Sequence, residues 1–336
     1  LSLSLSLSLT HSLTHSLISF VCTGSTLEET AKKNKEKEEN PVKAREYDNL
    51  MPRHWDSWKE VGVATHLFVM PILFSATEGS WKTTTTRNTA ADAKEGDVVV
   101  VVVDVMAGID TSVDNYSWHS QGSHIAFDAN PDYKGEGLGS PSQEAWKTKK
   151  NVYVVDVVGA VKAAREEGGV GAKEKGVVAD VSNKGGESHV VCITRDSEGT
   201  NALPSFAPDS GPPRLAYLSM ARGGYESDQL VLKLYDVDTH TTTHEVIKGH
   251  KVPRRRGSTW DLSIGNLFWV DQNTLLVIAG EDAREKIFSV DLRTGLCTLV
   301  ISEHFNWAVS ILPGKEEREE SCILSQERER ERERER

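Results

Sequence analysis

The chain has 336 residues, of which 38% are hydrophobic and 26% are charged, and it contains 26 glycines. These proportions supply enough apolar material for a folded core, and they exclude both a collagen-like and a wholly disordered protein. The formal net charge of -11 at pH 7 argues against a general nucleic-acid binder, because binding to phosphates requires a surplus of Lys and Arg on one face.

Apolar runs and cysteines exclude further classes. The longest apolar run, Val98 to Val103, has the length of a strand, so no membrane-spanning segment is predicted. The four cysteines are scattered and form no C-x-x-C pair, which indicates neither a zinc site nor a dense disulfide framework. We therefore expect no metal, no cofactor and no membrane or nucleic-acid partner, and a reducing, cytoplasmic location. The basic run Arg254 to Arg256 is interpreted as a solvated loop, with an anion or partner contact as the alternative.

The N-terminal segment is low in complexity. Leu1 to Leu9 alternates Leu and Ser, a period that can indicate a strand, and Leu13 to Cys22 can be read as the apolar part of a signal peptide. We set both interpretations aside, because no basic segment precedes the apolar one and Ser interrupts it. Glu28 to Glu46 is rich in Lys and Glu and is either a linker or a short exposed helix.

The C-terminal segment Glu327 to Arg336 alternates Glu and Arg and is too polar to pack. Leu-Ser and Glu-Arg are translations of complementary dinucleotide repeats, so we interpret both tails as products of such repeats rather than of selection for a fold. We expect residues 1–45 to be a low-complexity, charged segment, residues 46–313 to be the folded domain, and residues 314–336 to be a disordered charged tail.

A turn followed by a strand recurs along the middle of the chain. Each copy places an aromatic residue and turn formers before a short apolar strand. The three copies are Trp118 to Phe127, Phe206 to Tyr217 and, more weakly, Leu267 to Val277. Each is followed by a second strand that ends in an acidic residue and a turn. These second strands are Val152 to Val157, Leu232 to Thr239 and Ile287 to Gly295, the last leading into Cys297 to Ile301.

Such paired strands, separated by Gly-rich insertions, are typical of a propeller whose blades carry long loops. The sequence therefore predicts an all-β fold, an incomplete β-propeller with about four blades. The expected loops are Asp132 to Lys150 and Glu167 to Gly186, and the strongest candidate for a helix is Val158 to Glu167.

Three segments stand out as motifs: Arg53 to Trp58 reads R-H-W-D-S-W, Trp118 to Phe127 is a blade-type turn and strand, and Leu218 to Asp228 reads L-S-M-A-R-G-G-Y-E-S-D. They resemble, in the same order, the R-H-W-D-x-W segment, the W-S-P-D-G-K-x-I-A-F blade motif and the L-S-M-x-R-x-G-Y-E-x-D segment of dipeptidyl or acylaminoacyl peptidases in the prolyl oligopeptidase family (S9). TolB-like propellers share the blade motif, so the first and third segments narrow the resemblance. The matches run in family order, although Ser120 to Ser123 and Pro208 to Gly211 depart from the P-D-G-K turn.

The resemblance implies a function for the whole domain. In that family the propeller sits over an α/β-hydrolase domain and restricts which peptides reach the catalytic Ser. The G-x-S-x-G elbow of such a domain does not occur in this sequence, so we expect no catalytic residue here and a hydrolase domain as the missing partner. The resemblance thus implies the propeller of a serine exopeptidase that gates and binds a peptide substrate. The alternative is a stand-alone TolB-like propeller that serves as a protein-binding scaffold.

Three residues are candidates for contact with that substrate. In related dipeptidyl peptidases, acidic side chains of the propeller hold the free amino group of the peptide, which the resemblance carries to Glu226 and Asp228. Arg222 is the third candidate, either to orient the carboxylates or to bind a carboxylate. A surface turn with a local ion pair is the structural alternative.

Two groups of histidines are interpreted as structural. His240 and His244 have a spacing that brings metal ligands together only on a helix, and this Thr-rich segment follows a strand, so a hairpin edge is expected. His54 and Asp56 are close in sequence, and a packed structural cluster is favoured over a catalytic pair.

Overall fold

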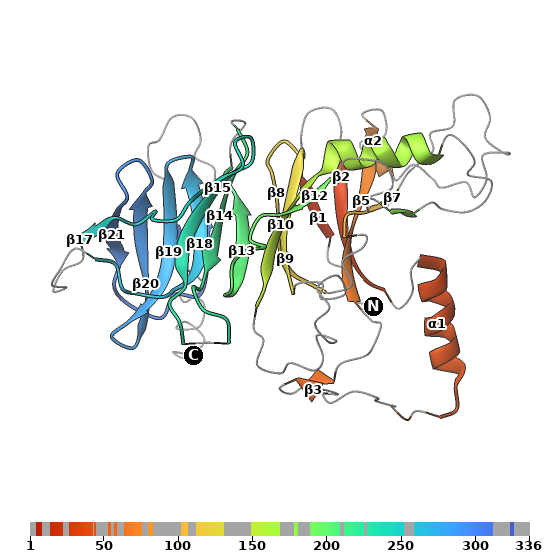
Figure 1. Ribbon diagram of the computed structural model, residues 1–336, viewed down its shortest axis with the longest axis horizontal. Coiled ribbons are helices and arrows are strands. Elements are labelled where there is room, and N and C mark those ends of the chain that lie inside the picture. Colours follow the sequence, from red (N-terminus) through yellow and green to blue (C-terminus); the bar gives the residue numbers. More distant parts are fainter. Residues whose placement is uncertain are drawn as a thin grey trace. The chain divides into compact units, whose positions relative to one another are not determined.

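The computed structural model describes residues 5–8, 14–22, 27–42, 44, 53–54, 57–58, 64–75, 80–82, 102–106, 112–130, 149–168, 178–180, 189–208, 212–224, 227–251, 259–311 and 323–325. These residues are mostly strands, joined into several sheets, and they include two helices (Figure 1). The chain divides into two compact units, Leu1–Ser197 and Glu198–Arg336. The prediction of an all-β fold is confirmed.

Three sheets follow one another along the chain, and each contains four antiparallel strands, which are consecutive in the second and third sheets and interrupted by α2 and β11 before β12 in the first. The first comprises β8 (Val113–Trp118), β9 (His124–Ala129), β10 (Asn151–Asp156) and β12 (Val190–Cys192). The second comprises β13 (Asn201–Phe206), β14 (Arg214–Ser219), β15 (Val231–Asp236) and β16 (Thr241–Thr243). The third comprises β18 (Ile264–Asp271), β19 (Thr274–Glu281), β20 (Arg284–Asp291) and β21 (Leu296–Ile301). This meander is the form of a propeller blade, as the recurring turn and strand predicted.

The third sheet has a fifth strand on its outer edge. β17 (Gly249–Lys251) precedes the other four in sequence but pairs in parallel with β21, the last of them. A parallel neighbour cannot be joined by a hairpin, and β18, the next strand in the chain, lies at the opposite edge of the sheet.

A different sheet occupies the N-terminal part of the first unit. Its strands are β1 (Leu5–Ser8), β2 (Thr14–Cys22), β5 (Ala64–Ser75), β7 (Val102–Asp104) and β11 (Val178–Asp180), in that order, with β6 (Ser80–Lys82) paired to β5. β7 and β11 are parallel, which distinguishes this sheet from a simple meander. β11 falls within a stretch that was expected to be a loop.

Three strands lie in the segments that were expected to flank the folded domain. β1 and β2 lie in the alternating N-terminal segment, where the strand interpretation had been set aside. β2 pairs along nine positions with β5, and period-2 alternation suits a strand wherever a neighbour offers its edge. At the other end, β23 (Ile323–Ser325) lies in the predicted disordered tail and pairs with β22 (Val309–Ile311).

Two helices and one short hairpin complete the description. α1 (Leu27–Glu39) decides the open choice between linker and helix, and ion pairs one turn apart, Lys32 to Glu36 at 3.8 Å and Lys35 to Glu39 at 3.7 Å, accompany it. α2 (Val157–Gly168) confirms the helix predicted there. β3 (Arg53–His54) and β4 (Ser57–Trp58) pair within the R-H-W-D-S-W segment. No helix in the described residues is long and apolar enough to cross a membrane.

Each unit has its own apolar core. In the second unit, side chains of the second and third sheets form one buried cluster, where the Trp260 and Phe288 rings meet edge to face at 5.1 Å. The Trp269 indole Nε1 donates to the Ser205 carbonyl at 2.9 Å and joins the two sheets. In the first unit, Phe127 stacks on Tyr153 at 5.1 Å within a cluster that reaches α2. The core of the second unit therefore holds the second and third sheets together, and with them the loop that joins β14 to β15.

Candidate functional site

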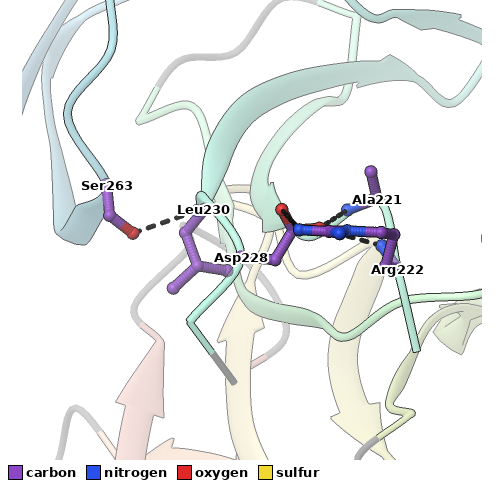
Figure 2. A network of polar contacts seen from close by, with 5 residues as sticks. All are labelled: Ala221, Arg222, Asp228, Leu230 and Ser263. Atoms are coloured by element: carbon purple, nitrogen blue, oxygen red, sulfur yellow. Dashed lines mark hydrogen bonds and ion pairs between the residues drawn. The ribbon is translucent and has the colours of Figure 1, made fainter. Parts of the chain in front are cut away.

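The predicted site residues lie in the loop that joins β14 to β15, and Asp228 closes this loop on itself. Its Oδ2 accepts hydrogen bonds from the backbone N–H groups of Ala221 at 3.2 Å and Arg222 at 3.0 Å. Its Oδ1 accepts from Arg222 Nη2 at 3.3 Å, as Figure 2 shows. One carboxylate thus binds both the main chain and the guanidinium at the start of the loop.

The electrostatics of the loop follow from these contacts. The Arg222 side chain is 59% exposed, whereas that of Asp228 is only 16% exposed. The hydrogen bond from the Arg222 guanidinium, supported by backbone N–H donors and the arginine charge, lowers the pKa of Asp228 below its usual value. Asp228 is therefore ionised at neutral pH, and the loop offers the guanidinium of Arg222 toward solvent.

Close approach of two backbones fixes the start of the loop. Met220 N donates to the Thr200 carbonyl at 2.8 Å. A Cβ atom added at Gly199 would lie 2.2 Å from the Met220 carbonyl oxygen, and one added at Gly223 would lie 2.6 Å from that of Glu198. These segments approach too closely for any side chain at the two glycines, so the sequence R-G-G-Y in the loop has a packing reason.

The end of the loop is tied to the beginning of the third sheet. Leu230 N donates to Ser263 Oγ at 3.0 Å (Figure 2), and Gln229 Nε2 donates to the Leu262 carbonyl at 3.0 Å. Ile264 N, the first residue of β18, donates to the Leu230 carbonyl at 3.1 Å. Both ends of the loop are thus anchored to the rest of the second unit.

The three predicted site residues have different outcomes. Arg222 and Asp228 meet as a local ion pair, which agrees with the structural alternative, because both oxygens of Asp228 hold the loop. Glu226 lies outside the described residues. Contact of any of the three with a substrate stays a prediction.

The structure describes some of the histidines that the sequence analysis interpreted as structural. His240 adopts a left-handed backbone, with φ of 53°, and its Nδ1 lies 2.9 Å from the Tyr235 hydroxyl, beside the edge strand β16. The prediction of a hairpin edge is confirmed. Among the side chains that the structure describes, no three His, Cys, Asp or Glu residues are grouped so as to hold a metal ion. The side chains of His54 and Asp56 and the run Arg254 to Arg256 lie outside the described residues.

One acid–base pair was missed by the sequence analysis. His66 Nδ1 lies 2.8 Å from Asp104 Oδ2, and Asp104 Oδ1 accepts from Met106 N at 2.9 Å, with both side chains largely buried. The pair joins β5 to β7. Its members are far apart in sequence and belong to no motif, so only the pairing of the strands reveals them.

Comparison with known proteins gives relatives but no family model, since none matches this chain. The chain is 26% identical over 278 residues to the probable dipeptidyl-peptidase 5 of Aspergillus niger, which covers 81% of this chain and 32% of that protein. It is 23% identical over 248 residues to dipeptidyl-peptidase 5 of Porphyromonas gingivalis, covering 74% of this chain and 27% of that protein. The chain resembles dipeptidyl-peptidase 5 proteins. It spans less than a third of the length of either relative.

Among solved structures, TolB from Acinetobacter baumannii matches 71% of this chain and 40% of its own, with 11% identity and a TM-score of 0.32. The similarity to dipeptidyl-peptidase 5 proteins, together with the blade-type sheets, agrees with the resemblance of Arg53 to Trp58 and of Leu218 to Asp228 to a peptidase propeller.

Proposed function

We propose that this chain is the propeller portion of a serine exopeptidase of the dipeptidyl or acylaminoacyl type, which gates and binds peptide substrates for proteolysis. The observation that carries the proposal is the similarity to a probable dipeptidyl-peptidase 5 over 81% of the chain. The three consecutive blade-type sheets are consistent with it.

In this proposal the chain selects the substrate and a hydrolase domain cleaves it. The sequence contains no G-x-S-x-G elbow, the turn that exposes the nucleophile in α/β-hydrolases. The chemistry is therefore assigned to a partner α/β-hydrolase domain, and the proposed location of the complex is the cytoplasm.

The anchored loop between β14 and β15 is the proposed contact with the peptide. A peptide amine binds best to a carboxylate through charge-assisted hydrogen bonds. Because Asp228 uses both oxygens within the loop, Glu226 is the stronger candidate for the amine, and Asp228 supports it. Arg222, exposed at the loop surface, is the proposed partner of a peptide carbonyl or carboxylate.

The proposal is tested by titrating the purified chain calorimetrically with a tetrapeptide, either with a free amino terminus or N-acetylated. A dipeptidyl-type site binds the free peptide about tenfold more tightly, the effect of one charge-assisted hydrogen bond. The reverse preference identifies the acylaminoacyl type. Absence of saturable binding by either peptide contradicts the proposal and favours a stand-alone protein-binding scaffold.

Variants separate the roles of the loop residues. Glu226→Gln is expected to abolish the preference for the free amine, whereas Arg222→Ala is expected to weaken both peptides equally. Glu245→Gln, at an exposed position after β16, is the matched control. If Glu226→Gln and Glu245→Gln bind alike, Glu226 does not contact the amine.

A further inference from the structure

Two histidines share one serine at the turn between β8 and β9. His119 Nδ1 lies 2.7 Å from Ser123 Oγ, and His124 Nδ1 lies 2.9 Å from the same oxygen. The two imidazole rings are 6.3 Å apart and nearly perpendicular. His119 is only 3% exposed, so its ring is removed from water.

The same corner holds the beginning of α2. The Ser123 carbonyl accepts from Val157 N, the first residue of the helix, at 3.0 Å. Asp156 Oδ1 accepts from Gly159 N at 3.0 Å and caps the helix. Asp156 is also the cross-strand neighbour of His124, so the cap and the shared serine belong to one end of the first sheet.

A third histidine faces the first turn of α2. His189 Nδ1 lies 4.0 Å from Asp156 Oδ2, and a Cβ atom added at Gly159 would lie 2.6 Å from the same nitrogen. The backbone joins these residues as well, since Asp156 N donates to the His189 carbonyl at 2.9 Å. Asp156 thus already serves both the helix cap and His189.

The hydroxyl of Ser123 limits how many protons this corner can hold. A serine has one proton to donate, so in the neutral state it donates to one imidazole Nδ1 and accepts from the N–H of the other. When both imidazoles are cationic, both Nδ1 atoms carry protons and both point at the same oxygen. Two adjacent cations then lie beside the positive end of a helix dipole, one of them in a buried position, and each of these terms opposes the second proton.

We propose that the corner formed by His119, Ser123, His124 and Asp156 is an acid-sensitive latch that holds the start of α2 on the first sheet. The latch is closed when the shared imidazoles are neutral and opens as they gain protons. Histidine ordinarily titrates near pH 6.5, so opening is expected below about that value. The unfolded corner binds more protons there than the folded one, which makes its stability fall as the pH falls.

Among the side chains that the structure describes on α2, β7 and β9, Lys162, Asp128 and Asp104 are the other charged groups, and each is exposed or engaged elsewhere. Lys162 of α2 is exposed. Asp128 of β9 binds Asn115 Nδ2 at 2.9 Å near the opposite end of the strand. Asp104 of β7 binds His66. The latch is therefore assigned to the histidine corner rather than to these groups.

The test is amide hydrogen exchange of residues 157–161 in the full chain at pH 7.5 and pH 5.5, with rates corrected for the intrinsic dependence of exchange on pH. For the wild type we expect the protection of these backbone amides to fall about tenfold for each unit of pH below 6.5. This is the slope expected when opening is coupled to the uptake of one proton. In the double variant His119→Asn and His124→Asn, the side-chain amide groups of the asparagines take the place of Nδ1 and do not titrate. The loss of backbone protection at low pH is therefore expected to disappear.

Controls distinguish the latch from a general effect of acid. His244→Asn, at an exposed position in the second unit, should retain the wild-type fall. The result that overturns the proposal is equal loss of protection in the wild type and the double variant, or no loss in the wild type. If the double variant does not fold, NMR titration of the wild-type imidazoles decides: protonation of His119 and His124 without a change at the α2 amides also overturns it.

Discussion

The two units of the chain use strands differently. In the second unit, the strands of each of the two large sheets follow in sequence and pair with their neighbours, apart from β17. In the first unit, β8, β9, β10 and β12 form one antiparallel sheet, with α2 and β11 inserted between its last two strands, and the N-terminal sheet joins β2 to β5 and β7 to β11 across long separations. A blade can be recognised in a sequence only where its strands are consecutive, because hairpins leave a local pattern in the sequence and distant pairings do not.

The largest expected difference between the units is in their cysteines. Burial raises the pKa of the Cys297 thiol in the second unit to about 12, and Cys297 is fully buried. Burial also raises the pKa of Cys192 in the first unit, but hydrogen bonds and nearby cations oppose it. We expect iodoacetamide at pH 8 to label native Cys297 roughly a thousandfold more slowly than an ordinary thiol, and Cys192 faster than Cys297.

Peptide mass spectrometry measures both labelling rates, and labelling in denaturant provides the control, where the two thiols should react alike. If Cys297 and Cys192 were labelled at the same rate in the native protein, the core of the second unit would open as readily as the edge of the first sheet.

Truncation of a core ring tests how far the second unit depends on its shared core. Phe288 is fully buried between the second and third sheets, and Phe288→Ala is expected to cost about 4 kcal/mol of unfolding free energy. Phe305→Ala removes the same atoms from a side chain that is 38% exposed, and a much smaller loss is expected. Urea unfolding followed by tryptophan fluorescence measures both, and equal losses would contradict the assigned core.

A side chain added where two backbones meet beside the loop is expected to cost less unfolding free energy than the loss of Phe288. Gly199→Ala places a methyl group against the Met220 carbonyl, and since neither backbone can yield easily, a loss of about 2 kcal/mol is expected. Gly265→Ala is the matched control, because the nearest atom to its added Cβ would be 3.9 Å away. Thermal unfolding compares the two variants. Equal losses in the two variants, or no loss in Gly199→Ala, would contradict the close approach.

The smallest expected effect is the loss of stability of the Asp228 loop at low pH. Because the folded pKa of Asp228 is lowered, its contribution is complete above the unfolded value of about 3.9 and is lost as pH falls through the lower folded value. We expect the Ala221 and Arg222 amides to stay protected at pH 5, where the histidine corner of the first unit opens. NMR measurement of amide exchange tests this order, and simultaneous opening of both would contradict it. Asp228→Asn should lose the dependence below pH 4.

The sequence predicted most of what is local in the fold. β10, β15 and β21 cover most of the predicted stretches Val152 to Val157, Leu232 to Thr239 and Cys297 to Ile301, and α2 covers Val158 to Glu167, because alternation and helical periodicity are properties of neighbouring residues. The strand at Thr14 to Cys22 was missed since its partner, β5, lies far along the chain. A polar or repetitive segment gives no sign of a partner that it meets only in the folded state.

The candidate site divides in the same way. Arg222 and Asp228 lie in one loop as an ion pair, which was the stated alternative to contact with a substrate. The anchors at Gly199 and Ser263 were not foreseen, because Gly199 meets the loop only through the pairing of β13 with β14, and Ser263 precedes a strand of the next sheet. The pair of His66 and Asp104 was missed because only the pairing of β5 with β7 brings the two residues together.

The parallel strand at the edge of the third sheet has a consequence for synthesis. Gly249 to Lys251 leave the ribosome before Leu296 to Thr298, the residues with which they pair, whereas β18, β19 and β20 each meet a partner that immediately precedes or follows them. Because domains fold as the chain emerges, we expect the hairpins of this sheet to assemble first and β17 to be added last. A nascent chain halted within β20 would therefore carry its future edge strand unpaired, and would be the species on which chaperones act.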